Sequence, residues 1–223
     1  MSRTVAVARV KGLDKTSPGY LREHVRTAER RGLDPSYLAA VISFETGGTF
    51  SPSIKNPVSG ATGLIQFMPS TAHQLGTTTT KLSQLSAEKQ LAYVDEYYRQ
   101  IVAWKGKLQS LEDHYLAVLG PANVGKPPSA VLYSSPSKAY TQNAALDKSG
   151  DGTITNEEAT TPVRGIYNAA KKLPPILVTL DDDGSPSPGS GSSSGPEGAI
   201  GAALLIAITA FSIARWKTRG KLS

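Results

Sequence analysis

A predicted helix with a glutamate on its buried face is the feature that most constrains this chain. Residues 34–45 begin with an N-cap residue and a proline, and two glycines follow their end. These four residues are Asp34, Pro35, Gly47 and Gly48. The apolar positions i, i+3 and i+4 hold Leu38, Val41 and Ile42. The next position on that stripe, i+7, holds Glu45, so a carboxyl group is predicted where an apolar side chain is expected.

The surroundings predicted for Glu45 would raise the pKa of its carboxyl group. A carboxylate on a buried stripe loses its hydration, and the C-terminal end of a helix is its negative end. Both effects disfavour the charged form, which is what a general acid working near neutral pH requires. The alternative interpretation is a glutamate that points to solvent from a frayed helix end.

The segment after this helix has the composition of a ligand-binding loop. Gly60 and Gly63 bracket small residues, where backbone can approach a ligand closely. Gln66 offers an amide that both donates and accepts hydrogen bonds, which suits an N-acetyl group or a sugar hydroxyl. Phe67 and Met68 could form an apolar wall behind a sugar ring. The alternatives are a surface amide for Gln66 and ordinary core packing for the two apolar residues.

Residues 45–52 and 56–72 together resemble the lysozyme-like lytic transglycosylase family, within the superfamily that also holds goose-type lysozymes. Members carry a glutamate followed by Ser-Gly-Gly, then a glycine-rich loop, Gly-Leu-Met-Gln and Met-Pro-x-Thr-Ala. Here Thr46 replaces the usual serine and Ile65 the usual methionine. The resemblance is strong over about residues 34–76 and extends weakly to about residue 170.

The resemblance implies an enzyme that cleaves the β-1,4 bond between N-acetylmuramic acid and N-acetylglucosamine in peptidoglycan. One glutamate, here Glu45, protonates the glycosidic oxygen and then takes the proton of the muramyl C6 hydroxyl, which closes a 1,6-anhydro ring. Asp95 or Asp113 could instead reach the cleft and support hydrolysis, as in a muramidase. A second alternative is a non-catalytic glycan-binding protein of a virion or cell envelope.

The resemblance also implies a set of residues that contact the glycan. In the family a Tyr-Asn-Ala-Gly-Pro motif on a later helix contacts substrate. Here Gly120-Pro121 is kept, but Tyr115 lies two places early and the asparagine is lost, so a core aromatic is the alternative. The predicted substrate-binding residues are Ser59, Gln66, Phe67, Met68 and Tyr115.

The rest of the first 180 residues is predicted to be helical. Ser17-Pro18 opens one helix, Ser86 opens a second, and a third runs from about Leu111 to Leu119. No clear alternating strand is found. The expected fold is therefore mainly α: a lysozyme-like helical domain over residues 1–180, followed by a disordered linker and a single C-terminal transmembrane helix.

Residues 147–158 fit the twelve-residue EF-hand loop. Gly152 occupies the sharp turn at position 6, and Ile154 is the apolar anchor at position 8. The predicted oxygen ligands are Asp147, Ser149, Asp151, the carbonyl of Thr153, and Glu158. Calcium is the cation that prefers so many oxygens, and a single such loop suits a structural Ca2+ ion. The alternative is a polar turn without metal.

Composition changes abruptly after Leu180. Residues 181–197 are rich in Asp, Ser, Gly and Pro, which predicts a disordered linker. Residues 198–214 contain 17 residues without a charge, the lower limit for a membrane-spanning helix. The basic tail 215–223 would lie in the cytoplasm if the membrane is a bacterial inner membrane. The alternative is a buried core helix.

The charge and the N-terminus suggest where such an enzyme acts. The net charge of +6 suits an anionic membrane surface or wall polymer, and nucleic acid need not be invoked. Residues 1–11 have no apolar run of the length that a secretory signal needs. We therefore expect a bacteriophage protein held in a viral membrane or penetration apparatus, with other virion proteins as possible partners. The stretch from Tyr115 through the calcium loop is also similar to muramidase domains of phage structural proteins. The alternative location is the bacterial inner membrane.

Overall fold

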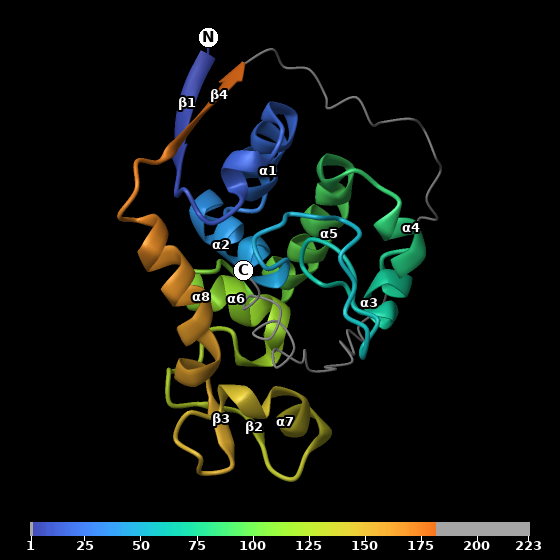
Figure 1. Cartoon of the computed structure of the whole chain (residues 1–223), viewed down its shortest axis with the longest axis vertical. Coiled ribbons are helices and arrows are strands. Elements are labelled where there is room, and N and C mark those ends of the chain that lie inside the picture. The colour runs from blue at the N-terminus through green and yellow to red at the C-terminus, as the bar shows by residue number, and fades with distance from the viewer. Residues whose placement is uncertain (1, 182–223) are drawn as a thin grey trace, which may run out of the picture.

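A computed structural model describes residues 2–181 of the chain (Figure 1). This part is mainly helical, as predicted. The α-helices are α1 Pro18–Arg30, α2 Pro35–Glu45, α3 Pro69–Gln74, α4 Thr79–Ser83, α5 Ala87–Lys105, α6 Leu111–Leu119, α7 Lys138–Asn143 and α8 Asn156–Ala170. The short 3-10 helices are η1 Leu13–Lys15, η2 Pro121–Asn123 and η3 Ala144–Leu146. The strands are β1 Ser2–Val7, β2 Val131–Ser134, β3 Thr153–Thr155 and β4 Ile176–Asp181.

The predicted helices begin where the sequence places their caps. The side chains of Ser17, Asp34, Ser86 and Ser110 each accept a hydrogen bond from a backbone N–H of the first turn. Helix α8 was not predicted. Its interior contains Pro162 and Gly165, residues that usually lower helix propensity. A capping box between Thr155 and Glu158 starts it nonetheless.

Helix α2 lies at the centre of the helical body, in contact with α1, α6 and α8, while α1 also packs on α5 (Figure 1). Residues Leu38 to Ile42 of α2 are all completely buried. A helix that is apolar on every side must be surrounded by other elements. Glu45, the last residue of α2, therefore lies in the interior of the helical body.

Residues 2–181 of the structure contain four short strands, although no clear alternating strand is found in the sequence. Strands β1 and β4 pair antiparallel in the register from Ser2↔Asp181 to Val7↔Ile176, so they join the two ends of the described region (Figure 1). The buried residues of β4, Val178 and Leu180, do alternate with exposed ones, but exposed Leu177 conceals this period in the sequence. A pairing across about 170 residues leaves no local signal.

Strands β2 and β3 also pair antiparallel, and they form with α7 a small lobe at one end of the helical body (Figure 1). We call residues 131–155 the small lobe. The partners Tyr133 and Ile154 lie opposite each other, and both are buried. The predicted calcium loop thus begins in this lobe and ends in α8.

Among residues 2–181, no helix is long and apolar enough to cross a membrane. The predicted transmembrane helix 198–214 and basic tail 215–223 lie outside the described residues. The same holds for the predicted linker 181–197, except that Asp181 is the last residue of β4.

Candidate functional site

Glu45 is buried at the end of α2, as its place on the apolar stripe predicts. Its residue is only 1% exposed, and its Oε2 atom has no hydrogen-bond partner. Burial raises the pKa of its carboxyl group from 4.5 to about 8. The group is therefore protonated at neutral pH, and one of its two oxygens is buried without a hydrogen-bond partner.

Three buried tyrosines interact electrostatically with the carboxyl group. Burial raises the pKa of the hydroxyls of Tyr97, Tyr98 and Tyr115, and the nearby charge of Glu45 raises it further. Tyr97 Oη donates to the carbonyl of Ala117 at 2.8 Å, and Tyr98 Oη donates to that of His114 at 3.0 Å. The hydroxyl of Tyr115 is buried without a partner.

Tyr115 was predicted at the site, whereas Tyr97 and Tyr98 were not. Tyr98 lies on the apolar stripe of α5, so the sequence identifies it as a core residue and nothing more. Tyr97 is adjacent to that stripe, and it comes close to Glu45 only because α5 packs against the other helices. No local signal could have found it.

Thr46, directly after Glu45, stands where the resembled family usually has serine. Its hydroxyl makes two hydrogen bonds that hold the backbone at the end of α2. Thr46 is fully buried, and its Oγ1 donates to the carbonyl of Ile42 at 2.7 Å. The same atom accepts the N–H of Phe50 at 3.0 Å. Phe50 has a φ of 53°, a left-handed conformation that is uncommon for a side chain of this size. The threonine hydroxyl therefore supports an unfavourable backbone turn beside the acid.

The second carboxylates considered for hydrolysis are engaged elsewhere. Asp95 pairs with Arg31 at 2.6 Å and with Arg30 at 3.3 Å. Asp113 accepts the backbone N–H groups of Gln109 and Gly125, each at 3.0 Å. Burial is the cause of the raised pKa of Glu45.

One buried side-chain atom of the loop of residues 50–68, Gln66 Oε1, has no hydrogen-bond partner. Gln66 has a φ of 52° and is 6% exposed. Its Nε2 donates to the carbonyls of Gly63 at 3.0 Å and Ile54 at 3.3 Å, while its Oε1 is buried and unpaired. A buried acceptor without a donor costs free energy, and such a group is a candidate for binding a ligand N–H or O–H.

The other predicted residues of this loop differ in their surroundings. Phe67 is buried, and its ring packs edge-on against Tyr97 with centroids 6.4 Å apart, which connects the loop to the surroundings of Glu45. Ser59 and Met68 are partly exposed. Ser59 Oγ accepts the N–H of Ala61 at 3.3 Å, whereas the backbone of Met68 serves as the N-cap of α3. Phe67 is thus linked through Tyr97 to the surroundings of Glu45, and Tyr115 interacts with Glu45 electrostatically, whereas Ser59 and Met68 make hydrogen bonds within their own segment.

The backbone of residues 147–158 has the turns that an EF-hand loop requires. Gly150 and Gly152 have φ values of 74° and 84°, and the N–H of Gly152 binds Asp147 Oδ2 at 3.0 Å. The anchor Ile154 is fully buried, as predicted. Glu158 bonds to the loop start, because its Oε1 accepts the N–H groups of residues 148 and 149 at 3.0 Å.

The carboxylates of the loop are held by its own N–H and O–H groups. A hydrogen bond from Tyr140 is the first cause of a lowered pKa at Asp147, and the N–H of Thr155 is the first cause at Glu158, whose pKa falls to about 2. Asp151 Oδ1 bonds to the N–H and hydroxyl of Thr153. Nowhere in residues 2–181 do three or more His, Cys, Asp or Glu side chains converge closely enough to hold a metal ion. The donor types and the turn therefore fit calcium, while the side chains are not gathered around one point.

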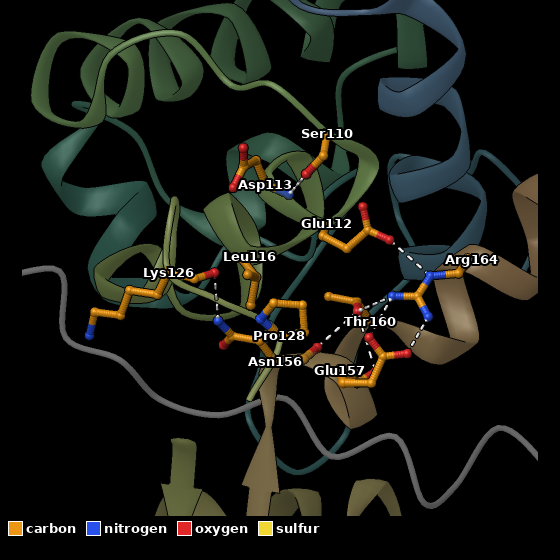
Figure 2. A pocket seen from close by; sticks show the side chains of 10 residues that line it. All are labelled: Ser110, Glu112, Asp113, Leu116, Lys126, Pro128, Asn156, Glu157, Thr160 and Arg164. Carbon is orange, nitrogen blue, oxygen red and sulfur yellow. Dashed lines mark hydrogen bonds and ion pairs between the residues drawn. The ribbon is translucent and has the colours of Figure 1, made fainter. Parts of the chain in front are cut away.

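A separate pocket of about 220 Å³ lies between α6 and the first half of α8 (Figure 2). Arg164 of α8 binds Glu112 of α6 at 2.8 Å and Glu157 at 2.5 Å. Asn156 donates to the carbonyl of Pro127 at 3.1 Å. These contacts pair charges of the pocket with one another, and the pocket lies between α8 and α6, the helix that carries Tyr115.

Comparison with known proteins finds a family model that matches the part of the chain that holds Glu45. Residues 25–94 match the family described as the transglycosylase SLT domain. The matched segment includes Glu45, Gln66 and Phe67, and it ends before Tyr115 and the calcium loop. No curated protein and no solved structure matches the chain. The match supports the lytic transglycosylase and lysozyme-like superfamily, and with it a peptidoglycan-cleaving enzyme at the level of the family.

Proposed function

We propose that this chain is a peptidoglycan lytic transglycosylase in which Glu45 serves first as the acid and then as the base. The observation that carries the proposal is the carboxyl group itself. It is buried, it is protonated up to a pH of about 8, and its Oε2 is unpaired. A general acid must be protonated at its working pH, and burial is what raises the pKa of this carboxyl group far enough.

The reaction needs one acid and no water. Glu45 gives its proton to the glycosidic oxygen, and the bond between that oxygen and C1 of N-acetylmuramic acid breaks. The C6 hydroxyl of the same sugar attacks C1, and its proton passes to the carboxylate of Glu45. The products are a 1,6-anhydro sugar and a free hydroxyl on the other fragment, and Glu45 is again protonated.

The remaining residues of the site suit a sugar substrate. Gln66 Oε1 can accept the N–H of the N-acetyl group, since it has no protein donor. The unpaired hydroxyl of Tyr115 can bond to a substrate oxygen or to Glu45. The N-acetyl group of the substrate stabilises the positive charge that develops at C1. A second carboxylate is therefore not required, as in other substrate-assisted glycosidases.

The same observations favour this reaction over the alternatives. Hydrolysis with inversion uses a second carboxylate at roughly 6.5–9.5 Å from the acid, and Asp95 and Asp113 are both occupied in other contacts. A binding module without activity would gain nothing from Glu45, because a buried carboxyl group without a hydrogen bond destabilises the fold.

The test is to incubate the full chain with purified peptidoglycan and to analyse the soluble products by mass spectrometry. Products ending in 1,6-anhydro-muramic acid, one water lighter than reducing-end products, are expected. Glu45→Gln should release none, whereas Glu88→Gln, which removes an exposed glutamate, should behave as the wild type. Reducing ends would indicate a hydrolase, and cleavage by Glu45→Gln would refute the assigned acid.

We also propose that the loop of residues 147–158 binds one structural Ca2+ ion. Asp147, Ser149, Asp151, Thr153 and Glu158 would supply its oxygens. The turn at Gly152 and the buried anchor Ile154 support this. The ion would draw together carboxylates that otherwise bond to the loop backbone, and it would stabilise the small lobe.

The location is a further proposal that rests on the sequence alone. The uncharged segment 198–214 and the basic tail 215–223 suit a membrane anchor, and a phage particle would deliver such an enzyme to the wall from outside. In a flotation assay, the full chain should float with liposomes, whereas a chain that ends at residue 197 should remain in the dense fraction. Mass spectrometry of purified particles would test the virion assignment.

A further inference from the structure

Gln90 is a buried amide on α5 whose three hydrogen bonds join three separate segments. The residue has no exposed surface. Its Oε1 accepts the N–H of Leu64 at 2.7 Å, and its Nε2 donates to the carbonyls of Leu82 at 2.8 Å and Pro52 at 3.1 Å. Because one atom accepts and the other donates twice, the side chain satisfies one backbone donor and two backbone acceptors at once. It therefore binds two points of the loop of residues 50–68, Pro52 and Leu64, and the last turn of α4.

The segment that Gln90 binds leads directly to Gln66. The N–H of Gln66 binds the carbonyl of Gly63 at 3.1 Å, and so does its side-chain Nε2 at 3.0 Å. The peptide between Gly63 and Leu64, which Gln90 binds through its N–H, thus also holds both nitrogens of Gln66 through its carbonyl. A rotation of this one peptide would turn the unpaired Oε1 of Gln66.

Gly63 shows how closely the amide approaches this peptide. Its φ is 86°, and a Cβ atom built there would lie 2.3 Å from Gln90 Oε1. Only glycine allows both this conformation and this contact. The backbone of Gly63 therefore approaches the Gln90 side chain more closely than any other residue type at position 63 would allow.

We propose that Gln90 is a positioning residue, which sets the orientation of Gln66 toward the substrate through the peptide between Gly63 and Leu64. This inference rests on the proposed function, since it assigns Gln66 to the glycan. A displacement of about 1 Å at a substrate-positioning group can reduce catalysis by about 100-fold.

The experiment compares Gln90→Met with a matched change far from the loop. Asn123 is also a buried amide with three hydrogen bonds, and it joins η2 to β2 and α8. Asn123→Leu and Gln90→Met each remove such an amide at nearly constant volume. With the full chain and purified peptidoglycan, Gln90→Met should lower kcat/KM at least tenfold, and Asn123→Leu should change it less than twofold. Equal losses would overturn the proposal.

A double-mutant cycle separates positioning from a general effect on stability. If Gln90 acts through Gln66, Gln90→Met should cost less than threefold in a chain that already carries Gln66→Ala. Additive losses would overturn the inference. If circular dichroism shows that Gln90→Met does not fold, Gln90→Asn shortens the side chain by one methylene and is tested in the same cycle; full activity of that variant would overturn the proposal.

The failure of the proposed function gives a different result. A wild-type chain that releases no product refutes the transglycosylase, and the positioning role is then tested by binding. Retention of the Glu45→Gln chain on insoluble peptidoglycan should fall at least tenfold in affinity when Gln90→Met is added. Unchanged retention would overturn the role of Gln90.

Discussion

Replacing Glu45 by glutamine should remove a dependence of stability on pH. Burial raises the pKa of Glu45 from 4.5 to about 8, so between these pH values the folded chain holds a proton that the unfolded chain has released. The free energy of unfolding therefore falls as the pH rises through this window. The contribution is fully present below pH 4.5 and is lost by about pH 8.

The size of the effect follows from the two pKa values. Each pH unit in the window changes the free energy of unfolding by about 1.4 kcal/mol, so the whole window corresponds to about 5 kcal/mol. Glu45 is only 1% exposed, and solvent does little to screen it. The loss is comparable to the total stability of many domains, about 5–15 kcal/mol. The Glu45→Gln chain has no such proton to lose, so its stability relative to the wild type should increase with pH.

Urea unfolding of the full chain at pH 5, 6.5 and 8, followed by circular dichroism, measures this difference. The two proteins should diverge by about 4 kcal/mol between pH 5 and pH 8. Glu88→Gln is the matched control, because it removes a carboxylate that is exposed. A difference between wild type and Glu45→Gln that stays constant with pH would refute the reasoning.

Three further predictions concern activity, metal and backbone. Glu45 must be protonated to act as the acid, so the rate of peptidoglycan cleavage should stay constant up to about pH 8 and fall about tenfold per pH unit above it. A wall-clearing assay measures this rate, and an optimum near pH 4.5 would contradict the prediction. Calcium at 100 times its Kd should stabilise the wild type by about 2.7 kcal/mol and should not stabilise Glu158→Gln, as measured by the Tm with calcium and with a chelator. Gly12→Ala should lower the free energy of unfolding by about 3 kcal/mol or more, because its Cβ would lie 1.8 Å from the carbonyl oxygen of Gly48. Gly32→Ala has a similar φ but nothing within 4 Å, so it should cost only about 1 kcal/mol in the same urea titration.

Much of the helical framework could be predicted because its signals are local. A cap residue such as Ser17 or Ser86 bonds to a backbone N–H three positions away, so the sequence alone contains both partners. The turn at Gly152 and the buried anchor Ile154 were predictable for the same reason. The burial of Glu45 was predictable because it lies on the same helix face as Leu38, Val41 and Ile42.

The strands and part of the site could not be predicted, because their partners are distant in the chain. Strand β1 finds its partner near residue 180, and Leu177 conceals the alternation that would have marked β4. Helix α8 was missed because Pro162 and Gly165 argue against a helix when read locally. Tyr97 approaches Glu45 only through the packing of α5.

The sequence by itself determined which groups are present and how each short segment is shaped. It has Glu45 on the apolar face of a helix, Gln66 after a glycine-rich turn, and oxygen-bearing side chains spaced along the twelve residues 147–158. Only the tertiary structure decided that the Glu45 carboxyl group is buried where its charge acts on three tyrosines, and that Gln90 binds the loop carrying Gln66. Periodicity and caps act over a few residues, whereas desolvation and side-chain contacts depend on segments that only the folded chain brings together.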